Sequence, residues 1–175
     1  ITAIKEAEII ILGPGSLYTS IIPNLLVAEI AEAIRNSTAI KVYVCNAMTQ
    51  AGETENYSAS QHLKAIIDHA GRGLVDFALI NNETINQEIL DRYSEEGAKP
   101  VRIDLDNIAS LGVKPLTAQV ITKNNLIRHD GLKLARFVLG LYRTQGIGHV
   151  FGKSLTKQLF RFLKGFASFF VAKLP

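Results

Sequence analysis

One stretch, residues 7–26, constrains the fold more than any other part of the sequence. It opens with a continuous apolar run, Ile9 to Leu12, which is typical of a short strand buried on both faces. Gly13 and Gly15 follow, and glycine adopts turn conformations that other residues resist. An apolar helical pattern then covers residues 22–36. The stretch therefore predicts a strand, a tight turn and a helix in direct succession.

This turn has two interpretations. A glycine turn that leads into a helix presents free backbone N–H groups to an anion, and the helix dipole favours negative charge there. On this interpretation the candidate ligand-binding residues are Gly13, Gly15, Ser16, Tyr18, Thr19 and Ser20. The stretch matches neither of the two common phosphate-binding signatures. An ordinary strand-to-helix turn is the alternative.

The rest of the sequence alternates between strand and helix patterns. Strands are predicted at 8–12, 40–45, 74–80, 100–103 and 118–122, and helices at 22–36, 59–70, 84–93 and 132–142. Ser58, Thr84 and Asp130 are the expected N-caps of the last three helices. Such alternation predicts an α/β fold with a mostly parallel sheet and helices on both faces.

Parallel sheets bind ligands beyond the carboxyl ends of their strands, so the loops that follow the strands are the candidate site. The loop after the second strand offers amides, hydroxyls and a carboxylate, which suit hydrogen bonding to a sugar: Asn46, Thr49, Gln50, Glu53 and Tyr57. The alternative is a hydrophilic loop that caps the next helix. Asn81 and Asn82 are interpreted first as turn residues, because Asn is common in turns.

Few other residues indicate a binding or catalytic role. Taken alone, Tyr93 is interpreted as a packing residue, and Arg128 could pair with a phosphate or with an acidic neighbour. The four histidines are scattered, with no spacing typical of a metal site. We find no nucleophile–base arrangement, so no catalytic residue is assigned from the sequence.

The net charge of +3 is unevenly distributed. Residues 1–130 carry a net charge of −5, whereas residues 131–175 carry eight basic residues and no acidic one. The globular part therefore gives no electrostatic reason to expect nucleic-acid binding. Basic residues recur every three to four positions between Lys153 and Lys164, among leucines and phenylalanines. We predict a basic amphipathic helical tail that lies on an anionic membrane or packs on protein.

Length and composition predict one globular domain. The single cysteine, Cys45, excludes an internal disulfide and suits a reducing compartment, and no signal peptide opens the chain, so we expect a cytoplasmic protein. The sequence begins with Ile1 and reaches its first strand almost at once, so we expect the C-terminal part of a longer protein. The predicted division is a domain at 1–143 and the tail at 144–175.

Several sequence blocks resemble the bacterial gluconeogenesis factor family, which is related to the 2-phospho-lactate transferases of coenzyme F420 biosynthesis. The first is Gly-Pro-Gly-Ser-Leu-Tyr-Thr-Ser-Ile-Ile-Pro-Asn-Leu-Leu at 13–26. The others, in order, are residues 41–50, 52–54, 96–101 and 128–135. The resemblance covers roughly residues 5–140. The Gly-Pro-Gly-Ser wording favours the regulator branch over the transferases.

The resemblance implies a Rossmann-like fold whose N-terminal half is absent here. It also implies a non-catalytic regulator of carbon metabolism, cell wall and cell shape that binds a nucleotide sugar, with UDP-N-acetylglucosamine as the ligand and no certain cofactor. By resemblance, Tyr93 stacks on or hydrogen-bonds to this ligand, and Arg128 pairs with its phosphate. The alternative is a transferase of a phosphorylated small molecule that uses Mg²⁺. The missing half, and a second copy of the chain, are the other expected partners.

Overall fold

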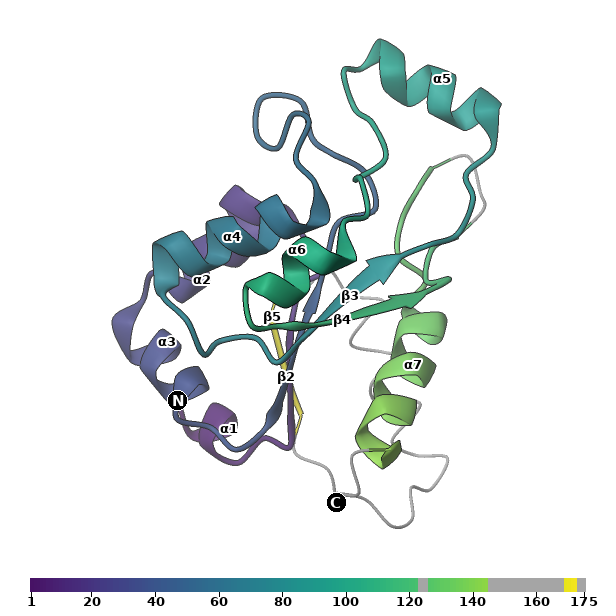
Figure 1. Ribbon diagram of the computed structural model, residues 1–175. Coiled ribbons are helices and arrows are strands. Elements are labelled where there is room, and N and C mark those ends of the chain that lie inside the picture. Colours follow the sequence, from purple (N-terminus) through teal and green to yellow (C-terminus); the bar gives the residue numbers. More distant parts are fainter. Residues whose placement is uncertain (123–125, 145–168, 173–175) are drawn as a thin grey trace.

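The computed structural model describes residues 1–122, 126–144 and 169–172, the last group through its backbone only. Five strands form one sheet in the order β4-β3-β2-β1-β5 (Figure 1). They are β1 (Ile9–Leu12), β2 (Ile40–Val44), β3 (Phe77–Asn81), β4 (Lys114–Ala118) and β5 (Phe169–Ala172). The first four strands are parallel, and β5 runs antiparallel beside β1. The predicted mostly parallel sheet is confirmed.

The helices lie on both sides of this sheet, as predicted for a Rossmann-like α/β fold (Figure 1). They are α1 (Thr2–Lys5), the π-helix η1 (Leu17–Ile21), α2 (Ile22–Leu25), α3 (Ala28–Arg35), α4 (Ala59–Ala70), α5 (Gln87–Glu95), α6 (Leu105–Ser110) and α7 (Gly131–Thr144). The helix α7 covers one face, whereas α2, α3, α4 and α6 cover the other. Only α5 stands away from the sheet, beyond its end (Figure 1).

Two separate apolar cores result from this arrangement, because successive side chains of a strand point to opposite faces. In β1, Ile10 and Leu12 face the core under α2 to α4, whereas Ile9 and Ile11 face α7. All four of these side chains are at most 3% exposed. The continuous apolar run in the sequence is therefore explained by a strand that is covered on both faces.

The predicted helix at 22–36 is wrong in its bounds and its continuity. Helical structure begins at Leu17, because Ser16 caps η1 and its carbonyl accepts the Ile21 N–H at 3.0 Å. The helix then breaks after α2, where Val27 is extended and exposed, and restarts as α3. Pro23 lies in the first turn of α2, where the N–H that proline lacks is not needed.

Two of the predicted strands are misplaced. Residues 100–103 contribute only isolated bridges, from Pro100 to Met48 and from Arg102 to Ser58. The predicted strand at 118–122 is replaced by β4, which ends at Ala118. Pro115 lies within β4, and proline is tolerated there because β4 is an edge strand that bonds only to β3. The short helix α6 was not predicted.

Two of the three predicted caps are confirmed. The Ser58 side chain accepts the N–H of Gln61 in a complete capping box at the start of α4. The Asp130 carboxylate accepts the N–H groups of Leu132 and Lys133 at the start of α7. The predicted Thr84 cap is wrong, because Asn86 caps the later-starting α5.

The predicted amphipathic tail falls mainly on residues 145–168 and 173–175, which lie outside the described residues. At residues 169–172, which the structure does describe, the predicted helix is wrong, because these residues form β5. In the described part of the chain, no single helix is long and apolar enough to cross a membrane. The helices spanning Leu17–Leu25 and Ala28–Arg35 meet that criterion only as a pair, bent by 78°.

Candidate functional site

A pocket of about 680 Å³ opens beyond the carboxyl ends of β1 and β2. Four segments line it: the loop after β1, the loop after β2, the end of α5, and the chain that leads into α7. The lining residues are Pro14, Gly15, Ser16, Asn46, Ala47, Met48, Thr49, Gln50, Tyr93, Thr122, Ile127, Arg128, His129, Asp130, Gly131 and Leu132. This is the rim where parallel sheets usually bind ligands.

The pocket brings together about half of the residues predicted for the site. Those that line it are Gly15, Ser16, Asn46, Thr49, Gln50, Tyr93 and Arg128. Those that do not line it are Gly13, Tyr18, Thr19, Ser20, Glu53 and Tyr57. Within this second group, Gly13, Thr19 and Glu53 support the turn that carries Ser16, whereas Tyr18 and Ser20 lie away from the pocket.

Gly13 has a structural reason to be glycine. Its φ is +94°, in a region that side-chain-bearing residues rarely adopt. A Cβ atom at this position would lie 3.0 Å from the Val44 carbonyl oxygen of β2. The turn therefore passes so close to the neighbouring strand that only glycine fits, and this closeness places Gly15 and Ser16 at the pocket.

Ser16 is the centre of a hydrogen-bond cluster that joins the first two loops. Its hydroxyl donates to the Glu53 carboxylate at 2.6 Å and accepts the Thr19 hydroxyl at 2.7 Å. The Thr19 N–H also reaches the Ser16 oxygen, at 3.4 Å. Glu53 and Thr19 thus hold Ser16 in place, and the first loop is fixed to the second.

Tyr18 and Ser20 lie away from the pocket. The Tyr18 ring packs edge-on against Tyr57 and His69, and its hydroxyl lies 3.0 Å from that of Tyr57. This hydrogen bond, with burial, raises the pKa of Tyr18 to about 12, so the phenol is neutral at physiological pH. The Ser20 carbonyl accepts the Asn24 side-chain amide at 2.6 Å.

The second loop lies against the chain that follows α5. Thr49 is 3% exposed, its N–H donates to the Lys99 carbonyl at 2.7 Å, and its hydroxyl oxygen accepts the Lys99 N–H at 2.9 Å. The Asn46 amide donates to the Gln50 side-chain oxygen at 3.3 Å. Thr49 therefore anchors the loop, whereas Asn46 and Gln50 present amides to the pocket.

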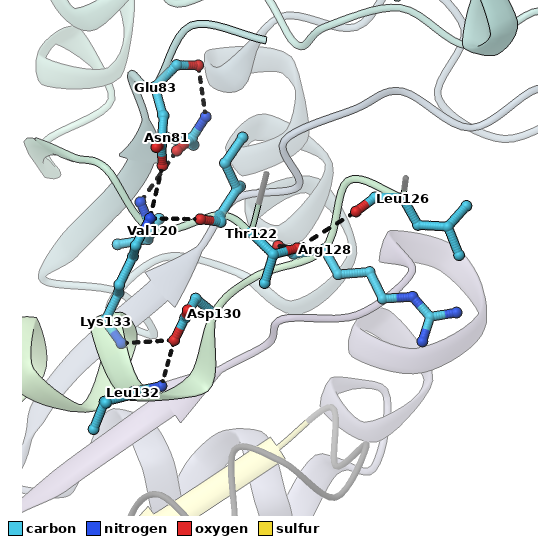
Figure 2. A network of polar contacts seen from close by, with 10 residues as sticks. Asn81, Glu83, Val120, Thr122, Leu126, Arg128, Asp130, Leu132 and Lys133 are labelled. Atoms are coloured by element: carbon cyan, nitrogen blue, oxygen red, sulfur yellow. Dashed lines mark hydrogen bonds and ion pairs between the residues drawn. The ribbon is translucent and has the colours of Figure 1, made fainter. Parts of the chain in front are cut away.

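Tyr93 and Arg128 lie on the opposite wall. The Tyr93 hydroxyl accepts the backbone N–H of Ile127 at 2.9 Å, which joins α5 to the segment that carries Arg128. The Arg128 carbonyl accepts the N–H of Thr122 at 2.8 Å. Figure 2 shows the exposed Arg128 side chain extending away from this backbone network.

A polar network beneath this wall fixes the start of α7 (Figure 2). The Lys133 ammonium contacts the Glu83 carboxylate at 3.1 Å and the Ile121 carbonyl at 2.7 Å. Glu83 is buried, so its charge requires such a partner. Asn81 accepts the Val120 N–H through its side-chain oxygen at 3.2 Å, which agrees with its interpretation as a structural turn residue.

His129 is a pocket residue that was not assigned to the site, although Arg128-His129-Asp130 stands out in the sequence as a charged cluster. The residue is half-buried, and its Nε2 is covered and has no hydrogen-bond partner among the described residues. Burial lowers the pKa of His129 to about 4, against the opposing effect of a hydrogen bond with the Cys45 backbone. The imidazole is therefore neutral at physiological pH.

Among the described residues, the side chains that line the pocket include one guanidinium, one carboxylate, two amides and the ring of Tyr93. Arg128 provides the guanidinium, and Asp130 provides a carboxylate that α7 already uses as its cap. Among the described residues, no group of three or more His, Cys, Asp or Glu side chains is placed to hold a metal ion. The arrangement is suited to binding a polar ligand that carries an anionic group.

The fold is that of a Rossmann-like α/β protein, and the pocket is a candidate ligand site at the strand ends. Residues 1–121 match the family described as 2-phospho-L-lactate transferase CofD. The chain belongs to this family, because the match covers more than half of its length.

Among curated proteins, the chain is 46% identical to the gluconeogenesis factor of Bacillus subtilis, over 82% of this chain and 45% of that protein. It is 47% identical to the gluconeogenesis factor of Halalkalibacterium halodurans, over 78% of this chain and 43% of that protein. These relatives confirm the resemblance to the gluconeogenesis factors. The chain spans less than half of the length of each.

Among solved structures, the chain resembles a crystal structure of a member of the UPF0052 family from Bacillus halodurans. The TM-score is 0.77 and the sequence identity is 46%. The match covers 79% of this chain and 44% of that one. The fold is therefore shared with a solved protein over most of the described residues.

Proposed function

We propose that the pocket binds a nucleotide sugar, with UDP-N-acetylglucosamine as the ligand, and that the protein is a cytoplasmic regulator of carbon metabolism, cell wall and cell shape without turnover of its own. The observation that carries the proposal is the composition of the pocket. It places an exposed guanidinium, two side-chain amides and an aromatic ring around one space of about 680 Å³. Pockets of about 300–1,000 Å³ are usual for ligands of this size.

The diphosphate and the sugars of such a ligand have chemical counterparts in the pocket. A diphosphate is dianionic, and the planar guanidinium of Arg128 pairs well with phosphate oxygens. Hydroxyl groups of a ribose or hexose suit the amides of Asn46 and Gln50, which both donate and accept. A further part of the same protein completes the site in this proposal, because the chain spans only 45% and 43% of the two curated relatives named above.

The test is a calorimetric titration of UDP-N-acetylglucosamine into the full-length protein that carries this sequence. We expect micromolar binding that falls by at least tenfold in Arg128→Ala. The matched control is Arg136→Ala, which removes an exposed arginine of α7 that does not line the pocket. Equal losses in the two variants, or no binding by the folded parent, would contradict the proposal.

A transferase of a phosphorylated small molecule is the second candidate, because the matched family is described as a 2-phospho-L-lactate transferase. The reaction would need Mg²⁺, and residues outside the described part would have to complete its coordination. Incubation of the full-length protein with the nucleotide sugar, a phosphorylated small molecule and Mg²⁺, followed by mass spectrometry, separates the two candidates. An unchanged ligand supports the regulator, whereas transfer or cleavage supports the enzyme.

A further inference from the structure

The contact between Tyr93 and Ile127 joins α5 to the segment that carries Arg128. Tyr93 lies near the end of α5, a helix in which Ile89 is the only buried residue. Its hydroxyl accepts the N–H of Ile127, 34 residues later and directly before Arg128. The same side chain lines the pocket. Tyr93 thus contacts both the candidate ligand site and the backbone that presents the guanidinium.

The backbone around Arg128 is fixed on its other side as well. The Arg128 carbonyl accepts the Thr122 N–H at 2.8 Å, and the Asp130 N–H donates to the Val120 carbonyl at 2.7 Å. Before Arg128, the side-chain contact from Thr122 to Leu126 is longer, at 3.4 Å. The bond from Ile127 to Tyr93, at 2.9 Å, is therefore the shortest restraint that the structure describes on the peptides that lead into Arg128.

We propose that Tyr93 is a positioning residue that acts through Arg128, by holding the Ile127 peptide so that the guanidinium projects over the pocket. The phenol oxygen of Tyr93 already accepts a hydrogen bond from this amide, so part of its acceptor capacity is used by the backbone and not by a ligand. One consequence is that α5 and Arg128 move as a unit. The expected effect on ligand affinity rests on the proposed nucleotide-sugar function, but the effect on the backbone does not.

The backbone effect is tested without any ligand, by amide hydrogen exchange on Tyr93→Phe. This substitution removes the acceptor and keeps the ring. We expect the Ile127 amide to exchange at least fivefold faster, whereas the Leu132 and Lys133 amides, which Asp130 caps, stay unchanged. Tyr142→Phe is the control, since it removes a hydroxyl that bonds to Glu8, away from the pocket. An unchanged Ile127 amide overturns the proposal.

The effect on binding is tested by a double-mutant cycle on the full-length protein with UDP-N-acetylglucosamine. Tyr93→Phe is combined with Arg128→Gln, which keeps a long polar side chain without the charge. We expect Tyr93→Phe to weaken binding about fivefold when Arg128 is present and less than twofold when it is substituted, because coupled residues are not additive. Equal fold losses in both backgrounds would show that Tyr93 acts independently, and would overturn the proposal.

The two tests separate the positioning role from the proposed function. If the parent protein does not bind the nucleotide sugar, the proposed ligand is wrong, and the exchange of the Ile127 amide still decides whether Tyr93 holds the Arg128 segment. If the parent binds the nucleotide sugar and the effects in the cycle are additive, the proposed ligand is supported and the positioning role of Tyr93 is rejected.

Discussion

The pocket has two walls that are built in different ways. The first, residues 13–20, is a single turn that is held by the bond from Thr19 to Ser16 and by Glu53 of the next loop, and it rests on the fully buried Leu17 and Ile21. The second wall joins Tyr93 to the segment at 126–130, from parts of the chain 34 residues apart. The first wall is thus part of the core, whereas the second depends on a few polar contacts.

Because of this difference, substitutions in the two walls should affect the stability of the domain to different extents. A substitution in the first wall disturbs the packing of β1 against β2, and so affects the whole domain. A substitution in the second wall changes how Arg128 is presented and leaves the core intact. The following predictions test this comparison.

The largest effect is expected for Gly13→Ala. The substitution combines a strained φ of +94° with a Cβ 3.0 Å from the Val44 carbonyl, and we expect it to lower the free energy of unfolding by about 4 kcal/mol. Gly112→Ala is the control, because Gly112 has a φ of +84° but no atom within 4 Å of its Cβ position. It should cost about 1 kcal/mol. Urea unfolding measures both, and similar losses would show that backbone closeness is unimportant.

The second prediction concerns pH and His129. Its pKa is about 4 in the folded protein and about 6.5 in the unfolded chain, so the unfolded chain binds the proton first as the pH falls. The stabilisation is fully present above pH 6.5 and is lost between pH 6.5 and 4, by at most about 3 kcal/mol.

Urea unfolding at several pH values checks this dependence. His129→Gln should flatten it, although a part should remain because burial also lowers the pKa of His62. If the substitution leaves the pH dependence as steep as before, His129 is not its source.

A smaller effect is expected for Glu53, which accepts the Ser16 hydroxyl. Glu53→Ala should lower the free energy of unfolding by about 1.5 kcal/mol, because it removes a charged acceptor from a partly buried hydroxyl. Glu55→Ala is the matched control in the same loop, because Glu55 contacts only the exposed Gly52 N–H among the hydrogen bonds described. It should cost less than about 0.5 kcal/mol. Thermal unfolding distinguishes the two variants.

The smallest global effect is expected for Asn86→Ala at the start of α5. The lost cap is worth about 1 kcal/mol, but it should appear only as local fraying, because α5 buries a single residue. We expect about fivefold faster amide exchange within α5 and an unchanged unfolding midpoint. Ser58→Ala removes the cap of the well-packed α4 and should lower the midpoint instead. A lower midpoint for Asn86→Ala would mean that α5 belongs to the cooperative core.

Elements with strong local patterns could be predicted from the sequence. The strand β1 is a continuous apolar run, β2 is apolar except for Lys41, and α4 and α7 have the expected caps at Ser58 and Asp130. The strand β4 was missed because proline is rare in strands other than edge strands, and the sequence alone does not show that Pro115 lies at the edge of the sheet. The strand β5 was missed because basic residues at helical spacing precede it.

The candidate site, like the fold, could be predicted only in part from the sequence. The loops after β1 and β2 could be placed on one rim, because the carboxyl ends of parallel strands meet there. The roles of single residues could not be predicted, since they depend on partners far along the chain. Thr49 bonds to Lys99 across 50 residues, and Glu53 to Ser16 across 37. Neither partner leaves a local signal.

The position of α7 also has a consequence for synthesis on the ribosome. In the described part of the chain, α7 is the helix that covers the face formed by Ile9, Ile11 and Val42. Its Tyr142 hydroxyl reaches Glu8 across 134 residues, donating to the carboxylate at 2.8 Å. While translation proceeds, β1 and β2 are complete long before their cover emerges. Between the synthesis of β2 and that of α7, the nascent chain therefore presents an apolar sheet face, which is the kind of surface that chaperones bind.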